Sequence, residues 1–415
     1  MSGYLTKIKT KIPYSDKKVD INVDGKTLIL TGGNGCGKTQ LINYLYEKLH
    51  DRVVKKDNSS LQQLEQLKIY YEQSMERDGP ASQSYDSWAQ NIQNTVQKME
   101  EIKQPSITLS DLEGFILKHK TFKALLLPFE AGRKSEILKP SSVSSLDLLK
   151  EKDRLSVENP HKNQAASSLF EEFLVTSIAN QAFSESKKIN NDPVEAERID
   201  KWFKKLEADL QHLFEDEKLR LVFQSDSFSF EIHQPHKEPY TFQSLSSGFS
   251  SIMAVYADLI TKVSLRLIDP DDLTGIVLID EIDAHLHVSL QKKILSFLTK
   301  AFPKVQFIVT THSPFVVSSV DDAVIYDLSK LEQVENLSMY SYEAVLEGLF
   351  GVLPISNLLQ QNIEAIAKLL EKHPINLDEL QSLLDKIPQD EGSLDSESLY
   401  FVNSAKLAIN KAKRN

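Results

Sequence analysis

Residues 27–49 read TLILTGGNGCGKTQLINYLYEKL, and this stretch decides the fold. Its first five residues are apolar or β-branched, as in a short buried strand. From residue 41 onward, apolar side chains recur at the spacing of one helix face. Between the two, residues 32–39 (GGNGCGKT) fit the pattern G-x-x-x-x-G-K-S/T. A strand, a glycine-rich turn and a helix in immediate succession predict a phosphate-binding P-loop at the start of an α/β fold.

The residue types of this loop match the needs of a triphosphate. Glycines allow a tight turn whose main-chain N–H groups form a cradle for phosphate oxygens. Lys38 brings a positive charge to the β- and γ-phosphates, and Thr39 offers a hydroxyl ligand to Mg²⁺. The expected ligands are therefore ATP and Mg²⁺. The residues expected to contact the phosphates are Gly32, Gly33, Asn34, Gly35, Cys36, Gly37, Lys38 and Thr39.

Two later segments supply the acidic and basic groups that ATP hydrolysis requires. Residues 275–281 (GIVLIDE) read as a buried strand that ends in a carboxylate pair. Asp280 is the expected second Mg²⁺ ligand, and Glu281 is the expected general base for the attacking water. The next apolar strand leads into residues 310–314 (TTHSP), where His312 is expected to hold the water and the γ-phosphate. Alternatively, His312 has no role in hydrolysis and simply lies in a loop that caps the following helix.

A second anion site is predicted at the start of an amphipathic helix. Residues 245–249 read LSSGF, and the helix after them carries apolar residues at helical spacing. Main-chain N–H groups and serine hydroxyls at a helix N-terminus bind anions. Ser246, Ser247 and Gly248 are the candidate residues. A second such site in one chain is useful if it serves the nucleotide of another copy.

The order of these motifs resembles that of the ABC-type ATPases. LSSGF is similar to their signature sequence LSGGQ, although Ser247 and Phe249 replace a glycine and a glutamine. The segment DEIDAHLHVSLQKKIL after Ile279 resembles the OLD-like ATPases, the group labelled AAA-15 or AAA-21. This resemblance implies that Asp283 and His287 lie at a dimer seam. It also implies a head-to-tail dimer in which residues 246–248 of one copy face the P-loop of the other.

The resemblance and the chain pattern together imply an ABC-ATPase-like P-loop fold with a mixed, largely parallel central sheet. Residues 1–54 and 216–340 are expected to form the ATPase core. Residues 55–215 read as a mainly helical insertion that contains one core strand near 123–129, and residues 135–160 within it read as a loop. Residues 341–415 read as a helical extension. His285 and His287 lack a third ligand at suitable spacing, so no structural metal site is predicted.

Composition narrows the class of protein further. The chain has 415 residues, a net charge of −11 and one cysteine, with no signal-peptide core and no run of about 18 apolar residues. A cytoplasmic protein without membrane contact is expected. Residues 1–56 hold 11 basic and 5 acidic residues, which leaves nucleic acid open as a partner. No TOPRIM or HNH nuclease pattern is visible in the sequence.

Three functions fit these observations. The first is an ATPase subunit that regulates a separately encoded effector, such as an HNH or TOPRIM nuclease. This hypothesis rests on a resemblance to the stand-alone ATPases of the Septu, retron and PARIS anti-phage systems. The second is a DNA-repair or recombination ATPase of the RecF-like type. The third is a nucleotide-binding domain of a transporter, which the long insertion and Phe249 disfavour.

Overall fold

The computed structural model describes residues 4–55, 61–103, 105–133, 137–158, 166–334, 337–338, 340, 342–350, 356–370, 372, 374–388, 394 and 396–414. The chain divides into two compact units, Met1–Met339 and Tyr340–Asn415. Unit 1 contains the sheets, and unit 2 is helical. Within the described residues, no helix combines the length and the apolar character needed to cross a membrane.

A six-stranded sheet forms the centre of unit 1, in the order β12-β11-β3-β10-β9-β5. Its strands are β3 (Thr27–Thr31), β5 (Ala124–Phe129), β9 (Thr274–Ile279), β10 (Val305–Thr310), β11 (Ala323–Asp327) and β12 (Glu332–Val334). All neighbouring pairs are parallel except β11 and β12. The prediction of a mixed, largely parallel sheet is confirmed. The predicted core strand near 123–129 is also confirmed as β5, the edge strand beside β9.

Two smaller antiparallel sheets accompany it. One contains β1 (Leu5–Lys11), β2 (Lys18–Asn22) and β4 (Ile107–Leu109), and the other contains β6 (Arg220–Gln224), β7 (Ser229–His233) and β8 (Tyr240–Thr241). Strand β9 is tied closely to β5 because Gly275, at φ +144°, has no side chain. A Cβ there would lie 2.3 Å from the carbonyl oxygen of Leu125, so only glycine fits.

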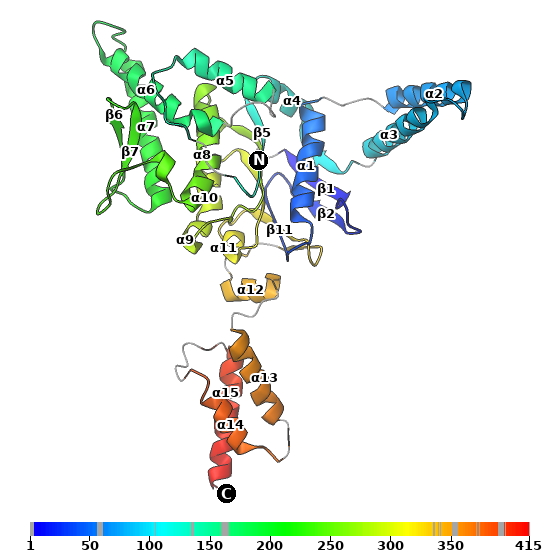
Figure 1. Ribbon diagram of the computed structural model, residues 1–415, viewed down its shortest axis with the longest axis vertical. Helices are drawn as coiled ribbons and strands as arrows, with labels where there is room; N and C mark the ends of the chain where they lie inside the picture. Colours follow the sequence, from blue (N-terminus) through cyan, green and yellow to red (C-terminus); the bar gives the residue numbers. More distant parts are fainter. Residues whose placement is uncertain are drawn as a thin grey trace. The chain divides into compact units, whose positions relative to one another are not determined.

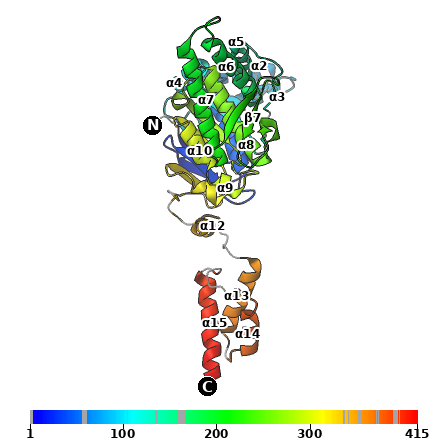
Figure 2. The same cartoon turned by 90° about the vertical axis from the view of Figure 1, so that its left-hand side faces the viewer.

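Helices cover both faces of the central sheet. Figure 1 shows α1 (Lys38–Val53) on one side, and α8 (Ser247–Leu265) with α10 (Ile294–Ala301) on the other. Figure 2, turned by 90°, has α7 (Pro193–Phe214), α8 and α10 facing the viewer. The other helices of unit 1 are α2 (Leu61–Asp78), α3 (Tyr85–Lys103), α4 (Leu112–Lys120), α5 (Leu146–Glu158), α6 (Phe170–Glu185), α9 (Val288–Gln291) and α11 (Pro314–Val317).

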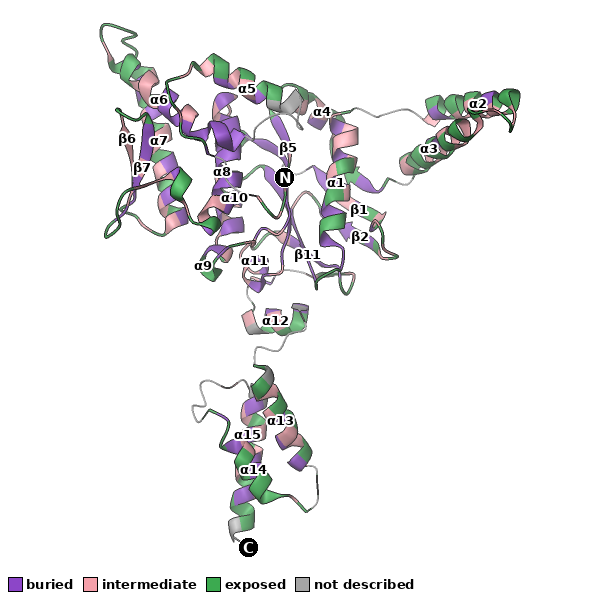
Figure 3. Cartoon of the chain, viewed as in Figure 1, coloured by how far each residue is buried: buried purple, intermediate pink, exposed green. Residues whose placement is uncertain are grey.

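Burial follows this layering. In Figure 3 the central strands and α8 are mainly buried, whereas the hairpin of α2 and α3 is mainly exposed. Every residue of β3 is buried, which explains its continuous apolar and β-branched sequence. Helix α7 begins where its sequence predicts, because Asp192 accepts a hydrogen bond from the Glu195 N–H (3.1 Å) and Pro193 occupies the first turn.

Unit 2 consists of α12 (Tyr342–Phe350), α13 (Asn357–Leu370), α14 (Leu377–Leu384) and α15 (Ser396–Arg414). Helices α13, α14 and α15 pack around one apolar cluster. Its buried members are Ile363, Ile366, Leu369, Leu380, Leu384, Ile387, Val402, Ala405 and Ile409. The described part of this unit is helical, and the domain boundary placed at residue 341 stays a prediction.

The loop expected over residues 135–160 is wrong for residues 146–158, which form α5. The helix is held by a buried charge cluster that its local sequence does not reveal. Asp153 is 3% exposed and accepts hydrogen bonds from Arg266 Nε (2.8 Å) and Lys262 Nζ (3.3 Å) of the segment that includes α8. Burial alone would raise the pKa of Asp153, but the two cations hold it below its usual value.

Replacing Asp153 by alanine is expected to lower the free energy of unfolding by about 3 kcal/mol, because two buried cations lose their shared partner. Urea denaturation followed by the fluorescence of Trp88 and Trp202 measures the loss. Since the pKa is lowered in the folded protein, this contribution is complete at neutral pH and is lost as the pH falls below 3.8. The matched control is Asp147→Ala on the same helix, whose side chain is 94% exposed. Equal stability of the two variants would contradict the assignment.

Candidate ATP-binding site

The parallel strands bring the motif residues to one edge of the sheet. Thr31, Ile279 and Thr310 end β3, β9 and β10, and Asp327 ends β11. Strand registers align these ends, with Asp327 opposite Thr31 and with Val309 opposite both Ile29 and Ile279. The segments that follow the strands therefore meet at the carboxyl edge, where α/β proteins bind their ligands.

The loop at residues 32–39 has the backbone that a phosphate cradle requires. Gly32, Gly35 and Gly37 adopt φ values of +131°, +75° and +104°, which side chains rarely tolerate. Helix α1 begins immediately afterwards at Lys38. Lys38 is buried, and its Nζ donates to the carbonyl oxygens of Gly32 (2.9 Å) and Gly33 (3.0 Å). The ammonium group is therefore held inside the loop.

The two expected Mg²⁺ ligands lie together although 241 positions separate them. Thr39 Oγ1 donates to Asp280 Oδ2 (2.9 Å), and Thr310 Oγ1 donates to Asp280 Oδ1 (2.5 Å). A hydroxyl and a carboxylate are the oxygen donors that Mg²⁺ prefers beside nucleotide phosphates. The described residues contain no cluster of three or more His, Cys, Asp or Glu suited to a metal. Thr39 and Asp280 would thus hold the predicted Mg²⁺ together with a bound nucleotide.

Glu281 stands beside this pair in a rare backbone conformation. Its φ is +45°, in the left-handed region, and its N–H donates to Thr310 Oγ1 (2.7 Å). Non-glycine residues in this region persist where the surrounding structure holds them, often at functional sites. Glu281 is half-buried. This placement suits the role of general base that the sequence predicts.

Arg133 fixes the turn that carries Glu281, and it was not among the candidate site residues. Its guanidinium donates to the carbonyl oxygens of Asp280 (2.8 Å) and Ile282 (3.0 Å). Burial lowers the pKa of Arg133 to about 10, against the opposing effect of Asp283, Asp280 and Glu281. The only sequence signal was its position a few residues after the strand at 124–129.

His312 lies in the same site. Its pKa is lowered from 6.5 by burial first and then by the positive charge of Lys38, while the nearby carboxylates oppose the shift. The preceding Thr311 donates from Oγ1 to Asp283 Oδ1 (2.6 Å), which ties the histidine loop to the segment after Glu281. The lowered pKa favours the neutral imidazole, which can donate from one nitrogen and accept at the other.

The NMR titration midpoint of His312 is expected below 6.5, because burial and Lys38 both disfavour the imidazolium. Lys38→Ala is expected to move the midpoint upward, since it removes the neighbouring positive charge. His312→Gln identifies the resonance by its loss. A midpoint above 6.5, or one that Lys38→Ala leaves in place, would show that the two side chains are not neighbours.

The signature residues lie elsewhere in the chain. Ser246 precedes α8 as its N-cap residue, and Phe249 stacks on Phe214 at the end of α7, with ring centroids 4.2 Å apart and planes within 1°. Residues 246–248 line a cavity of about 240 Å³ with His285 and His287. Among the described residues, no hydrogen bond or ion pair joins residues 246–248 to residues 32–39. Within the described residues, the predicted signature segment and the P-loop therefore lie at separate places in the chain's fold.

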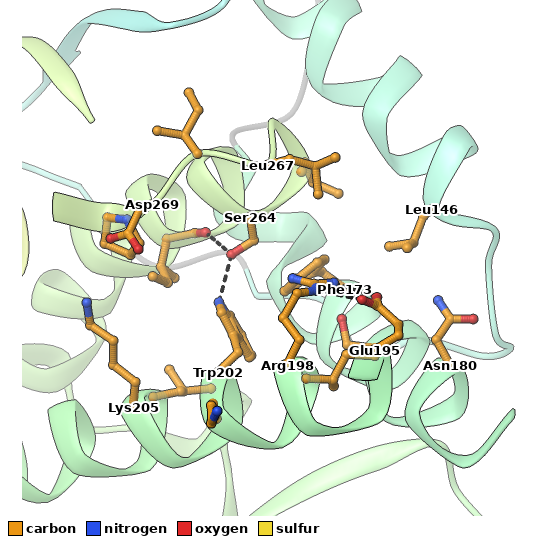
Figure 4. Close-up of a pocket in the computed structure, with 18 of the residues that line it drawn as sticks. Leu146, Phe173, Asn180, Glu195, Arg198, Trp202, Lys205, Ser264, Leu267 and Asp269 are labelled. Atoms are coloured by element: carbon orange, nitrogen blue, oxygen red, sulfur yellow. Dashed lines mark hydrogen bonds and ion pairs between the residues drawn. The ribbon is translucent and has the colours of Figure 1, made fainter. Parts of the chain in front are cut away.

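A larger cavity of about 690 Å³ lies between α5, α6, α7 and α8, away from the phosphate site (Figure 4). Trp202 of α7 donates its indole N–H to Ser264 Oγ of α8 (3.1 Å), and Arg198 pairs with Glu195 (2.6 Å) on α7. The two long helices that line this cavity, α7 and α8, also reach the signature residues. Helix α8 begins there, and α7 ends at Phe214, whose ring stacks on Phe249.

The sheet order and the groups gathered at its edge define a P-loop ATPase of the ABC type. The chain belongs to the family described as "AAA domain, putative AbiEii toxin, Type IV TA system", whose model matches residues 111–318. Similar proteins include the Retron Ec83 probable ATPase of Escherichia coli, 43% identical over 114 residues, which cover 26% of this chain and 21% of that protein. The resemblance to defence-associated ATPases is thereby confirmed.

Two Septu proteins PtuA are also similar. The protein from Bacillus mycoides is 29% identical over 202 residues (46% of this chain, 28% of that protein), and the protein from Bacillus thuringiensis is 33% identical over 145 residues (31% and 36%). The matches thus span about a third or less of these relatives' lengths. Among solved structures, an Smc head domain from Pyrococcus furiosus has a TM-score of 0.36 and 14% identity, covering 80% of this chain and 95% of that chain.

Proposed function

We propose that this chain is a Mg²⁺-dependent ATPase that dimerises head to tail around two ATP molecules and regulates a separately encoded effector. The observation that carries the proposal is the meeting of Thr39, Asp280, Glu281 and His312 at one sheet edge, with the signature at a separate site. Because the P-loop has no described hydrogen bond or ion pair with the signature of its own chain, we expect the signature of a second copy to complete the site.

The assigned roles follow from position. Lys38 and the loop N–H groups bind the phosphates, and Thr39 with Asp280 holds Mg²⁺, which neutralises phosphate charge when bound. Glu281 accepts a proton from the attacking water, and His312 orients that water against the γ-phosphate. Ser246, Ser247 and Gly248 bind the partner's nucleotide. Asp283 and His287 lie in the segment beside the signature and form the seam between copies.

Regulation of an effector is supported by the similar proteins and by the helical insertion. Proteins named Retron Ec83 probable ATPase and Septu protein PtuA match this chain. The insertion supplies a mechanical link, because α7 runs from the larger cavity to the Phe214–Phe249 stack at the signature. Opening and closing of the dimer would thus move a surface that an effector, such as an HNH or TOPRIM nuclease, can bind.

A DNA-repair function is the second candidate, on the basis of the basic N-terminal segment. Several of those lysines pair with acidic side chains at the surface: Lys7 pairs with Asp20 (3.1 Å) and Lys11 with Asp16 (2.7 Å). Lys38 is inside the phosphate loop. Part of the positive charge of residues 1–56 is thus neutralised by acidic side chains of the same protein. Less charge is left to bind DNA, which favours the effector role.

One assay separates the two. ATP hydrolysis by the purified chain is measured with Mg²⁺ or EDTA, with linear double-stranded DNA, and with the product of the adjacent open reading frame. The proposal expects hydrolysis that requires Mg²⁺, changes with the co-expressed protein and is unchanged by DNA ends alone. Stimulation by DNA ends without the second protein would favour the repair function.

A further inference from the structure

The turn after β11 lies against the first two glycines of the phosphate loop. Strand β11 pairs with β3 so that Asp327 is opposite Thr31, and the Leu328 N–H donates to the Thr31 carbonyl oxygen (2.9 Å). Leu328 is fully buried. The turn at residues 327–330 is therefore anchored to the strand that precedes the loop, although almost 300 positions separate them in sequence.

Asp327 gives this turn its shape. The carboxylate is fully buried, and its Oδ1 accepts hydrogen bonds from the N–H groups of Ser329 (2.7 Å) and Lys330 (3.4 Å). Lys17 adds a third tie by donating to the Leu328 carbonyl oxygen (2.9 Å). These contacts fix the position of Ser329, an exposed residue whose hydroxyl lies beside the phosphate loop.

A single peptide group of the loop connects that hydroxyl to Lys38. The Gly33 N–H donates to Ser329 Oγ (2.8 Å), and the Gly32 carbonyl oxygen accepts from Lys38 Nζ (2.9 Å). These two atoms belong to the same Gly32–Gly33 peptide. Ser329 therefore sets which way that peptide faces, and this orientation gives Lys38 its acceptor. Successive hydrogen bonds of this kind polarise and strengthen one another.

The packing explains why the peptide needs such a tie. A Cβ on Gly32 would lie 2.8 Å from Ser329 Oγ and 3.1 Å from Asp327 Oδ1, so the turn and the loop are in close contact. Gly32 also has φ +131°, which only glycine adopts without strain. A peptide between two glycines has little steric resistance to rotation. Without an external hydrogen bond, its orientation would be poorly determined.

We propose that Ser329 is a positioning residue of the ATP site, which pins the Gly32–Gly33 peptide and thereby pre-orients Lys38 for the triphosphate. The inference rests on the proposed ATP-binding function and adds a residue that no motif identifies. Ser329 acts before the chemical step. It orders the loop in advance and so lowers the entropy cost of ATP binding. It does not contact Asp280, Glu281 or His312 through any described hydrogen bond.

The test compares Ser329→Ala with Ser329→Thr, which keeps the hydroxyl. Ser329→Ala is expected to raise the Kd and KM for ATP about five- to tenfold, the effect of one lost hydrogen bond, and to leave kcat within about twofold. Ser329→Thr is expected to restore ATP binding. Ser225→Ala, in the exposed turn between β6 and β7, is the matched control.

Cys36 provides a readout that does not depend on turnover. It is the single cysteine of the chain, is 8% exposed and lies 3.0 Å from the Cβ position of Gly32. In the absence of nucleotide, iodoacetamide should label Cys36 several times faster in Ser329→Ala than in the wild type. The labelling rate of Ser329→Thr should equal that of the wild type. Unaltered labelling, or ATP binding within about twofold of wild type, would overturn the inference. A wild-type chain that binds ATP without hydrolysing it would count against the proposed ATPase activity, not against this role.

Discussion

Glu281→Gln is expected to lower ATP turnover at least about 100-fold and to trap an ATP-bound dimer. The amide keeps the size of the side chain but cannot accept a proton from water. The backbone at Glu281 is held by Thr310 and Arg133, neither of which contacts the carboxylate, so the turn should persist in the variant. Phosphate release in a single turnover, together with light scattering after size-exclusion chromatography in ATP, measures both effects.

Glu217→Gln is the control for this variant, because Glu217 is an exposed residue in the turn before β6. It should leave turnover and the monomer–dimer equilibrium unchanged. Wild-type turnover in Glu281→Gln would show that another group activates the water. A slow variant that remains monomeric in ATP would support the base assignment but contradict the ATP-dependent dimer.

Ser246→Arg is expected to abolish the part of turnover that depends on dimerisation while leaving ATP binding to the single chain unchanged. Ser246 caps α8 in the small cavity with His285 and His287, so a long cationic side chain would fill the space that a partner's phosphate needs. The P-loop of the same chain makes no described hydrogen bond to residues 246–248, which is why its own affinity should persist. The rate per chain, measured against protein concentration, reports the loss.

Ser84→Arg, in the exposed turn that precedes α3, introduces the same charge far from the signature in sequence and serves as the control. It should preserve the rise of specific activity with protein concentration. A Ser246→Arg chain that kept this concentration dependence would contradict the head-to-tail sandwich. Weaker ATP binding in the isolated variant would show instead that the signature acts within its own chain.

Much of the fold followed from local sequence. Strand β3, the loop and α1 were predicted from the apolar run, the glycines and the helical spacing, because these features act over a few residues. The strand before Asp280 and the parallel sheet were predicted on the same grounds. Helix α5 was missed because Ser-, Lys- and Pro-rich flanks suggested a loop, whereas Asp153 is stabilised by Lys262 and Arg266 more than 100 positions away.

The candidate site divides in the same way. Glycine spacing, Lys38, Thr39, Asp280, Glu281 and His312 were all visible as motifs, since each motif carries its own chemistry. Arg133 and Ser329 were not among the candidate residues. Both act through main-chain groups of distant segments: Arg133 through the carbonyls after β9, and Ser329 through Gly33, 296 positions earlier. Backbone recognition leaves no residue pattern at the recognised positions.

The sequence by itself determined the nucleotide chemistry, because a triphosphate and its metal require particular residue types at fixed local spacing. It also determined that strands and helices alternate around a parallel sheet. Only the tertiary structure decided which strand ends meet, with Thr39 beside Asp280 and the signature apart from both. Strand order is set by hydrogen bonding and packing between distant segments, and these long-range contacts also tie Ser329 to the loop and α7 to the signature.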